Sequence, residues 1–169
     1  HADPTKKISS GLLSPKFNNN SIFGLSYSQP YYISLSEHKD LTLTPTMTSD
    51  EGPIIETHYR SLRSKGSSEI KTSFTRGSHT NIDGKETNKF RGHVDLKVAE
   101  RIDKNWIIGL NATRASDFSY MQRYKMGNTS NNNLTQRIYL SGSDKDFYTK
   151  IEGMYFQPLN AFKSNRNVP

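Results

Sequence analysis

Apolar and polar residues alternate along most of this chain with the period of two that is typical of β-strands. In the segment Phe23–Ser36 the odd positions carry Phe, Leu, Tyr, Gln, Tyr, Ile and Leu. The clearest alternation lies in KFRGHVDLKVAE, residues 89–100. One face of that segment carries Phe90, Gly92, Val94, Leu96 and Val98, and the opposite face is mostly charged.

Segments of this kind recur along the chain and are separated by turn-forming residues. They cover residues 23–36, 41–48, 55–60, 69–76, 89–100, 106–116, 134–142 and 147–156. Short turns alternate with long polar loops, which we place at 78–88 and 125–133. The stretch ASDFSYMQRY, residues 115–124, fits either a helical turn or a continuing strand. The predicted fold class is all-β, an antiparallel meander of about eight strands.

The first hairpin is predicted to close through a five-residue connection, Ser36–Asp40. This register pairs Leu35 with Leu41, Ile33 with Leu43, and Tyr31 with Pro45. It places the apolar residues of both strands on the same side of the sheet, as a shared face requires.

Both strands of this hairpin contain a proline, Pro30 in the first and Pro45 in the second. Proline has no N–H to donate to a sheet ladder and is rare in paired strands. In the predicted register the two prolines lie almost level with each other. From the residues alone, protection of a sheet edge or a pair of bulges explains them best. A deliberately weakened pairing is the alternative.

The composition narrows the class of protein further. Only 32% of the 169 residues are apolar, against about 45–50% in typical globular chains, so a dry core is hard to fill. A net charge of +7 fits anionic partners, and eight Phe, nine Tyr and one Trp argue against disorder. The chain has no cysteine and begins HADPTKK without an initiator Met. We expect it to be a piece of a longer protein.

The two faces of the strands can meet solvent in opposite ways. A soluble sandwich or lipocalin-like barrel buries the apolar face, whereas an outer-membrane barrel turns it to lipid and encloses the charges in a wet lumen. Segments of about 9–11 residues and alternating short and long connections favour the membrane barrel. Aromatic residues near strand ends, as in an interfacial girdle, favour it as well. They are Tyr31, Tyr32, Phe90, Trp106, Phe147 and Tyr155.

Four stretches of the sequence, taken in order, resemble one known family. They are HADPTKKISSGLLSPKF, then SIFGLSYSQPYYISLSEHKDLTLTPTMTSDEGPIIETHYRSL, then KFRGH, and DKNWIIGLNATRASDFSYMQRY. Their order and spacing resemble the LptD family of outer-membrane lipopolysaccharide-assembly proteins, also called organic solvent tolerance proteins (OstA). The resemblance covers nearly the whole chain.

The resemblance implies a fold, a location and partners. In that family a periplasmic β-jellyroll receives lipopolysaccharide from periplasmic bridge proteins. A very large barrel, plugged by an LptE-like outer-membrane lipoprotein, then releases it into the outer leaflet. Residues 1–17 would be the exit segment from the jellyroll, and residues 18–169 the first strands of the barrel in the bacterial cell outer membrane. Pro30 and Pro45 would match prolines of a lateral gate, where weak pairing lets the glycolipid leave the lumen sideways.

The charged sides of the strands supply candidate lumen residues for phosphorylated lipid. They are His58, Arg60, Lys71, Arg91, His93 and Lys97. Arginine suits phosphate because its planar guanidinium donates in pairs. The alternative is an ordinary hydrated barrel interior without specific recognition. Glu56 and Asp95 lie among these cations, so the predicted lining is mixed rather than a basic track.

Other chemistry finds little support in the sequence. The five histidines, His1, His38, His58, His79 and His93, lack metal-ligand spacing, and no catalytic or phosphate-loop motif is present. We therefore expect no enzyme activity, no cofactor and no metal. Aromatic residues do not cluster with basic grooves, so we expect no nucleic-acid binding. A soluble lipid-binding β-barrel or sandwich and a purely structural outer-membrane protein remain the alternative functions.

Overall fold

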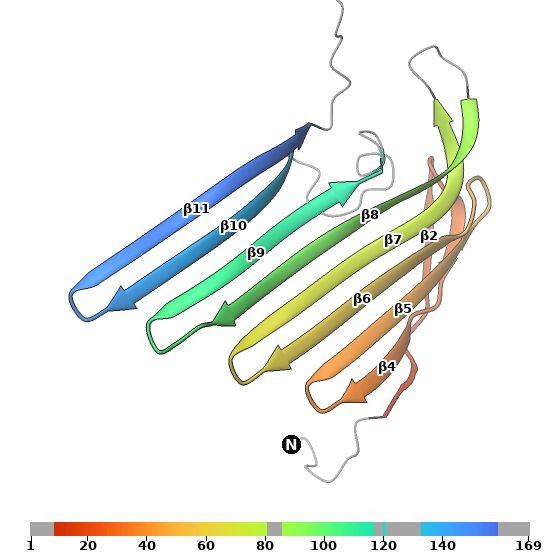
Figure 1. The fold of residues 1–169 in the computed structure, drawn as a ribbon. Coiled ribbons are helices and arrows are strands. Elements are labelled where there is room, and N and C mark those ends of the chain that lie inside the picture. Colours follow the sequence, from red (N-terminus) through yellow and green to blue (C-terminus); the bar gives the residue numbers. More distant parts are fainter. Residues whose placement is uncertain (1–8, 81–85, 117–119, 121–132, 159–169) are drawn as a thin grey trace, which may run out of the picture.

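The computed structural model describes residues 9–80, 86–116, 120 and 133–158, and within them it forms an antiparallel sheet of eleven strands (Figure 1). The predicted all-β class is confirmed. The strands are β1 (Gly11–Leu12), β2 (Lys16–Asn20), β3 (Gly24–Ser28), β4 (Tyr31–Ser36), β5 (Lys39–Thr48), β6 (Ile54–Arg63), β7 (Gly66–Thr80), β8 (Glu86–Arg101), β9 (Trp106–Ala115), β10 (Asn133–Asp144) and β11 (Phe147–Pro158). Across these described ranges we find no helix of the length and apolarity needed to cross a membrane.

The predicted meander is present from β4 to β11, because each of these strands pairs with the next one in sequence. Short connections close one end of the sheet, at residues 37–38, 64–65, 102–105 and 145–146. The longer connections lie at the opposite end (Figure 1). In the turn before β9, Asp103 Oδ1 accepts hydrogen bonds from the backbone N–H groups of Asn105 and Trp106. Most of the predicted segment 115–124 and loop 125–133 lies outside the described residues.

The N-terminal edge consists of two interrupted strands. β1 pairs with β4 and β2 pairs with β3, while β3 and β4 both pair with β5. The predicted strand 23–36 is therefore real but broken at Gln29–Pro30, and residues 11–20 form a further strand beside it. The sequence reading missed this outer strand because residues 11–20 show no alternation.

The predicted register of the first hairpin is wrong by two residues. The structure pairs Tyr31 with Leu43 and Ile33 with Leu41. The connection is the two-residue turn Glu37–His38 rather than a five-residue loop, and the ladder shifts near its end, between Ser34 and Ser36. A shift of two residues keeps the same side chains on the same face, so the predicted shared apolar side survives.

The predicted polar loop 78–88 is also largely wrong. β7 continues to Thr80 and β8 begins at Glu86, so only residues 81–85 separate the two strands. Their ladder runs without a register shift from Gly66 opposite Glu100 to Thr80 opposite Glu86. Thr and Ser side chains are compatible with a paired strand, which is why polarity alone misplaced this boundary.

Residues opposite each other in neighbouring strands share a face, so the register divides the sheet into two surfaces. We call one the apolar face. It carries Leu25, Tyr31, Ile33, Leu41, Leu43, Pro45, Ile55, Ile70, Phe74, Val94, Leu96, Leu110, Ile138 and Ile151. We call the other the polar face. It carries Thr42, His58, Arg60, Glu69, Lys71, Ser73, Arg91, His93, Asp95, Lys97 and Thr113.

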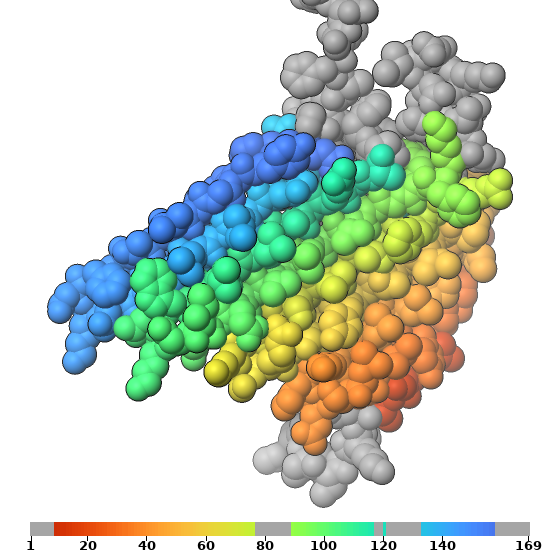
Figure 2. All heavy atoms as spheres, viewed as in Figure 1, coloured from red at the N-terminus to blue at the C-terminus, as the bar shows by residue number. Residues whose placement is uncertain are grey.

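Burial is inverted relative to a water-soluble domain. Among the described residues, four hydrophobic side chains are buried, Ile54, Ala115, Tyr120 and Leu134. Ser73 and Arg91, on the polar face, are 0% and 3% exposed, whereas Leu25 and Ile138, on the apolar face, are 63% and 54% exposed. In the space-filling view the side chains of neighbouring strands form continuous rows from β4, in orange, to β11, in blue (Figure 2). The apolar face of the sheet is therefore exposed.

Two aromatic side chains cover glycines where β9 and β10 meet. Tyr139 lies opposite Gly109, and its ring occupies the space that a Cβ on that glycine would need. Trp106 lies over Gly142 in the same way on the other face. Such pairs fill the gap that a glycine leaves in a sheet. Tyr139 is thereby fixed on the polar face beside the hollow described below.

Candidate functional site

The two predicted gate prolines lie side by side in the sheet. Ser28 pairs with Thr46 and Tyr31 pairs with Leu43, so Gln29 and Pro30 between them lie opposite Pro45 and Thr44. The prolines are therefore one residue step apart across the hairpin. This nearly level position is the one that the sequence suggested, although the pairing partners differ.

A third proline falls at the same level in the outer strand. Leu12 pairs with Tyr31 and Lys16 pairs with Ser28. The break between β1 and β2, which contains Pro15, therefore lies opposite the break between β3 and β4. We call Pro15, Pro30 and Pro45 the proline line. It interrupts three neighbouring strands at one height.

Two prolines of this line each remove one ladder donor, on opposite sides of β3 and β4. The carbonyl of Pro30 accepts a hydrogen bond from the Leu13 N–H at 2.9 Å, and the carbonyl of Pro45 accepts one from the Gln29 N–H at 3.1 Å. The N and O atoms of a strand residue point to the same neighbour in an antiparallel ladder. The missing N–H of Pro30 therefore faces Leu13, and the missing N–H of Pro45 faces Gln29.

The side chain of Gln29 replaces one of these donors. Its Nε2 donates to the Leu13 carbonyl at 2.8 Å, which is the acceptor that an N–H at position 30 would serve. Its Oε1 accepts a hydrogen bond from the Tyr27 hydroxyl at 2.8 Å, which holds the amide in place. The sequence reading did not single out Gln29. Gln29 could have been recognised in the sequence, because it is a polar residue at an apolar-face position directly before a proline.

The ladders around the proline line are short. β1 and β4 share two residue pairs, and β3 and β5 share three. By contrast, β7 and β8 share fifteen, and β10 and β11 share twelve. The other two ladders at this edge, β2 with β3 and β4 with β5, share five pairs each. The proline line thus divides the pairing of the N-terminal edge into short ladders.

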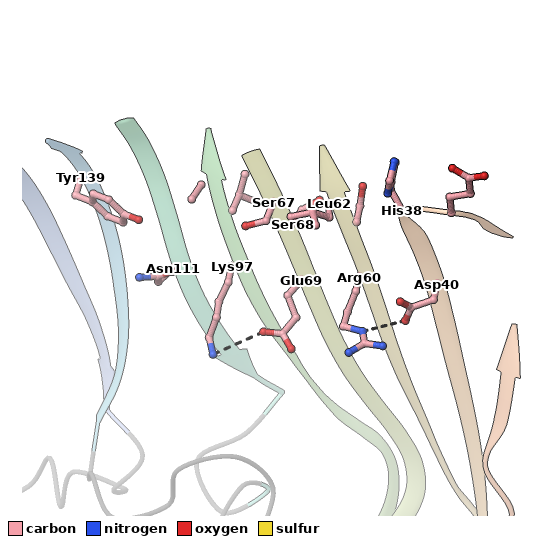
Figure 3. Close-up of a pocket in the computed structure, with 14 residues that line it drawn as sticks. His38, Asp40, Arg60, Leu62, Ser67, Ser68, Glu69, Lys97, Asn111 and Tyr139 are labelled. Carbon is pink, nitrogen blue, oxygen red and sulfur yellow. Dashed lines mark hydrogen bonds and ion pairs between the residues drawn. The ribbon is translucent and has the colours of Figure 1, made fainter. Parts of the chain in front are cut away.

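The polar face carries a row of alternating charge close to the short-turn end. Asp40, Arg60, Glu69, Lys97 and Asn111 lie opposite one another on five successive strands, β5 to β9 (Figure 3). Arg60 Nε and Asp40 Oδ1 are 2.9 Å apart. The next row on the same face contains His58, Lys71 and Asp95. We call these two rows the charged rows.

Glu69 is the centre of the charged rows. Its Oε1 lies 2.7 Å from His58 Nε2 and 3.1 Å from Lys71 Nζ, and its Oε2 lies 3.9 Å from Lys97 Nζ. Three of the six predicted lumen residues thus gather on one carboxylate that the sequence reading did not name. Such pairs neutralise much of the positive charge, which favours the mixed lining that was expected.

The remaining two predicted lumen residues, Arg91 and His93, lie farther from the short turns and are buried. His93 Nδ1 and Ser73 Oγ form a 2.5 Å hydrogen bond, and Ser73 Oγ lies 2.7 Å from the Tyr120 hydroxyl. The Arg91 guanidinium carbon lies 5.4 Å from the centre of the Tyr120 ring. Tyr120 therefore packs on the polar face, over β7 and β8.

Two hollows follow the charged rows along the polar face. The first, of about 540 Å³, is lined by Asp40, Arg60, Glu69, Lys97, Asn111 and Tyr139 among others (Figure 3). The second, of about 440 Å³, is lined by Lys16, Pro30, Glu56, His58, Lys71 and Asp95 among others. No cluster of three or more potential metal ligands occurs among the residues that the structure describes. The second hollow reaches the proline line at Pro30.

Comparison with known proteins identifies relatives over most of the chain. The family LPS transport system D (LptD) matches residues 89–169. The chain is 34% identical to the LPS-assembly protein LptD of Paracidovorax citrulli over 136 residues, and 31% identical to that of a Shewanella strain over 133 residues. Each alignment covers 78% of this chain. The LptD of Actinobacillus pleuropneumoniae serotype 5b is 27% identical over 89% of this chain.

The relatives are much longer than this chain. The aligned regions cover 16% of the Paracidovorax protein, 17% of the Shewanella protein and 20% of the Actinobacillus protein. The chain therefore corresponds to about a fifth or less of each relative.

Proposed function

Because this chain belongs to the LptD family, we propose that it forms the first strands of an outer-membrane barrel that transports lipopolysaccharide. The expected boundary at residue 17 moves toward the N-terminus, because β1 and β2 within residues 11–20 already pair in this sheet. The residues before β1 lead out of a preceding periplasmic domain. The role is transport and assembly rather than catalysis. Its partners are lipopolysaccharide, the periplasmic bridge proteins that deliver it and a lipoprotein plug of the LptE kind.

The observation that carries this proposal is the difference between the two faces. The apolar face exposes Leu25, Val94 and Ile151 at 63%, 40% and 64%. At about 25 cal/mol per Å² of apolar area, leaving such a surface in water is costly, whereas acyl chains cover it without cost. A soluble barrel or sandwich would bury these side chains, so the exposed face argues against that alternative.

The polar face suits an aqueous passage for an anionic glycolipid. The charged rows keep cations and carboxylates paired and hydrated along two hollows of the wall. Arg60, His58, Lys71 and Lys97 are held by Asp40 and Glu69. Balanced charge lets phosphates pass from one weak contact to the next, since each of these four cationic side chains is paired with a carboxylate.

The proline line is the proposed lateral gate. Pro30 and Pro45 remove ladder donors on both sides of the β3–β4 strand, and the adjoining ladders are short. A backbone hydrogen bond contributes about 1 kcal/mol in water and more in hydrocarbon, where no water replaces it. The β3–β4 strand is therefore the place where the wall separates sideways and lets lipopolysaccharide leave the lumen.

Photo-crosslinking tests which face meets lipid. A photoreactive amino acid is placed at Leu43 or at Thr42 in the full-length protein, which is then studied in bilayers. These neighbours have opposite orientations in β5. We expect Leu43 to crosslink to acyl chains and Thr42 not to. Equal lipid crosslinking from both positions, or crosslinking from Thr42 alone, would refute the assigned orientation.

Gln29→Leu should loosen the gate. The leucine cannot donate to the Leu13 carbonyl, so the β1–β4 junction loses the bond that replaces the missing proline N–H. A loss of about 1 kcal/mol corresponds to roughly a fivefold rise in the open population. Uptake of a large antibiotic that the outer membrane excludes should increase in cells carrying only this variant. Gln136→Leu, on the same face but away from the proline line, is the control. Unchanged uptake in Gln29→Leu cells would remove the residue from the gate.

A further inference from the structure

The two ends of the apolar face differ in whether their arginines are paired with a carboxylate. At the short-turn end, Arg63 forms an ion pair with Glu100, with 2.8 Å between Nη2 and Oε2. At the long-loop end, the exposed residues Arg76 and Arg114 lie on this face. Neither arginine has a carboxylate partner among the described residues. The long-loop end of this face therefore presents two arginines without a carboxylate partner among the described residues.

A shallow groove of about 570 Å³ begins beside these cations. Small residues, Gly92 and Ala112, lie among the bulkier side chains of Phe74, Phe90, Val94 and Leu96 that line it. Arg114 also lines the groove, and the Arg76 guanidinium carbon lies 5.8 Å from the centre of the Phe90 ring. Phe74 and Phe90 are 52% and 82% exposed. The groove thus combines an apolar floor with a positively charged rim.

The position of the groove fits a lipid headgroup region. In outer-membrane barrels, short turns face the periplasm and longer loops face outward. The groove lies at the long-loop end on β7 to β10, and β7 is two strands away from β5 and the proline line. If the proposed function holds, Arg76 and Arg114 lie at the level of the outer leaflet's headgroups, with the apolar part of the groove reaching toward the acyl chains.

We propose that this groove is a binding site for lipopolysaccharide on the outer wall of the protein, separate from the transport path. Lipid A phosphates bind Arg114, which lines the groove, and Arg76, which lies two strands away on β7, because a guanidinium donates two parallel hydrogen bonds to phosphate oxygens. An acyl chain lies over Gly92 and Ala112, between the phenylalanines and Leu96. The inference rests on the proposed function, since the apolar face must meet lipid. The site holds exported molecules in the outer leaflet against the barrel.

The test measures lipid bound to purified full-length protein in nanodiscs by native mass spectrometry. The proteins are the native form, R76A/R114A, and Ala112→Leu, which fills the groove but keeps both cations. Lys39→Ala is the control, because it removes an exposed cation from the same face at the short-turn end. The lipids are lipopolysaccharide, lipopolysaccharide stripped of its lipid A phosphates, and phosphatidylglycerol.

Loss of charged hydrogen bonds should weaken lipopolysaccharide binding roughly tenfold or more in R76A/R114A. Ala112→Leu should also weaken it, Lys39→Ala should not, and the dephosphorylated lipid should bind the native form and R76A/R114A alike. Equal loss of phosphatidylglycerol would overturn the assignment to lipopolysaccharide. Unchanged lipopolysaccharide binding in R76A/R114A would overturn the site. The rate of lipopolysaccharide export in cells carrying R76A/R114A is measured as well, and a slowed rate would place the arginines in the transport path and also overturn the site. Leu43 crosslinking tests the proposed function separately, so its success with unchanged lipid binding would refute this inference alone.

Discussion

Replacing both Pro30 and Pro45 with alanine in the full-length protein should slow lipopolysaccharide export by roughly fivefold or more. Each alanine restores one N–H to the ladder, directed to the Leu13 carbonyl in one case and to the Gln29 carbonyl in the other. The bond to the Gln29 carbonyl is new and contributes about 1 kcal/mol, which is a factor of about five in the open population and more in hydrocarbon. The bond to the Leu13 carbonyl adds less, because the Gln29 side chain already donates to that oxygen. The strand between β1 and β5 is then held on both sides.

The measurement is the rate at which lipopolysaccharide reaches the cell surface in cells carrying only the variant protein. Pro53→Ala is the matched control, because Pro53 lies in the connection before β6 and interrupts no ladder. Pro45→Ala alone should slow export by roughly fivefold. Pro30→Ala alone should slow it less, because Gln29 already donates to the Leu13 carbonyl. A normal rate in the double variant, with the protein assembled at normal levels, would show that pairing at the proline line does not limit export.

Pro30→Ala and Gln29→Leu should also interact, because the Gln29 amide and a backbone N–H at position 30 serve the same acceptor. Once the N–H restored by Pro30→Ala donates to the Leu13 carbonyl, the glutamine side chain is dispensable. The two changes are therefore non-additive, as expected for groups that share a partner. This coupling separates a role for Gln29 in the ladder from a general effect of removing a polar side chain.

The alternation of residue types predicted the faces of this sheet well, and parity explains why. A strand error of two residues, such as the shifted pairing of Tyr31 with Leu43, leaves every side chain on its original side. The sequence could not reveal that Glu37–His38 alone forms the turn, because loop length is not written in the alternation. It also could not reveal the strand at residues 11–20, since that strand pairs without an alternating pattern.

The sequence predicted which residues belong to the site, but not which of them contact one another. The six cationic and histidine positions share the polar face, as their alternation indicated, but their common partner Glu69 depends on which residues of β6, β7 and β8 lie opposite one another. Likewise, Pro30 and Pro45 were recognisable from the sequence, whereas the substitution of a proline N–H by Gln29 depends on the path of residues 11–15. Such contacts arise between segments whose relative height only the folded sheet determines.

Leu43→Arg should destabilise the folded protein in a bilayer by about 2–4 kcal/mol, the range for a cation near the midplane on the lipid face of a barrel. Leu43 lies halfway along β5, between Tyr31 and Thr57 on the apolar face. The adjacent Thr42→Arg places the same charge beside the second hollow of the polar face, which is hydrated in the proposed barrel. Urea titration of the two variants refolded into vesicles compares them directly. Because the introduced residue, strand and depth are matched, only the solvent on each side of the sheet differs. Equal stability of the two variants would mean that Leu43 does not face acyl chains.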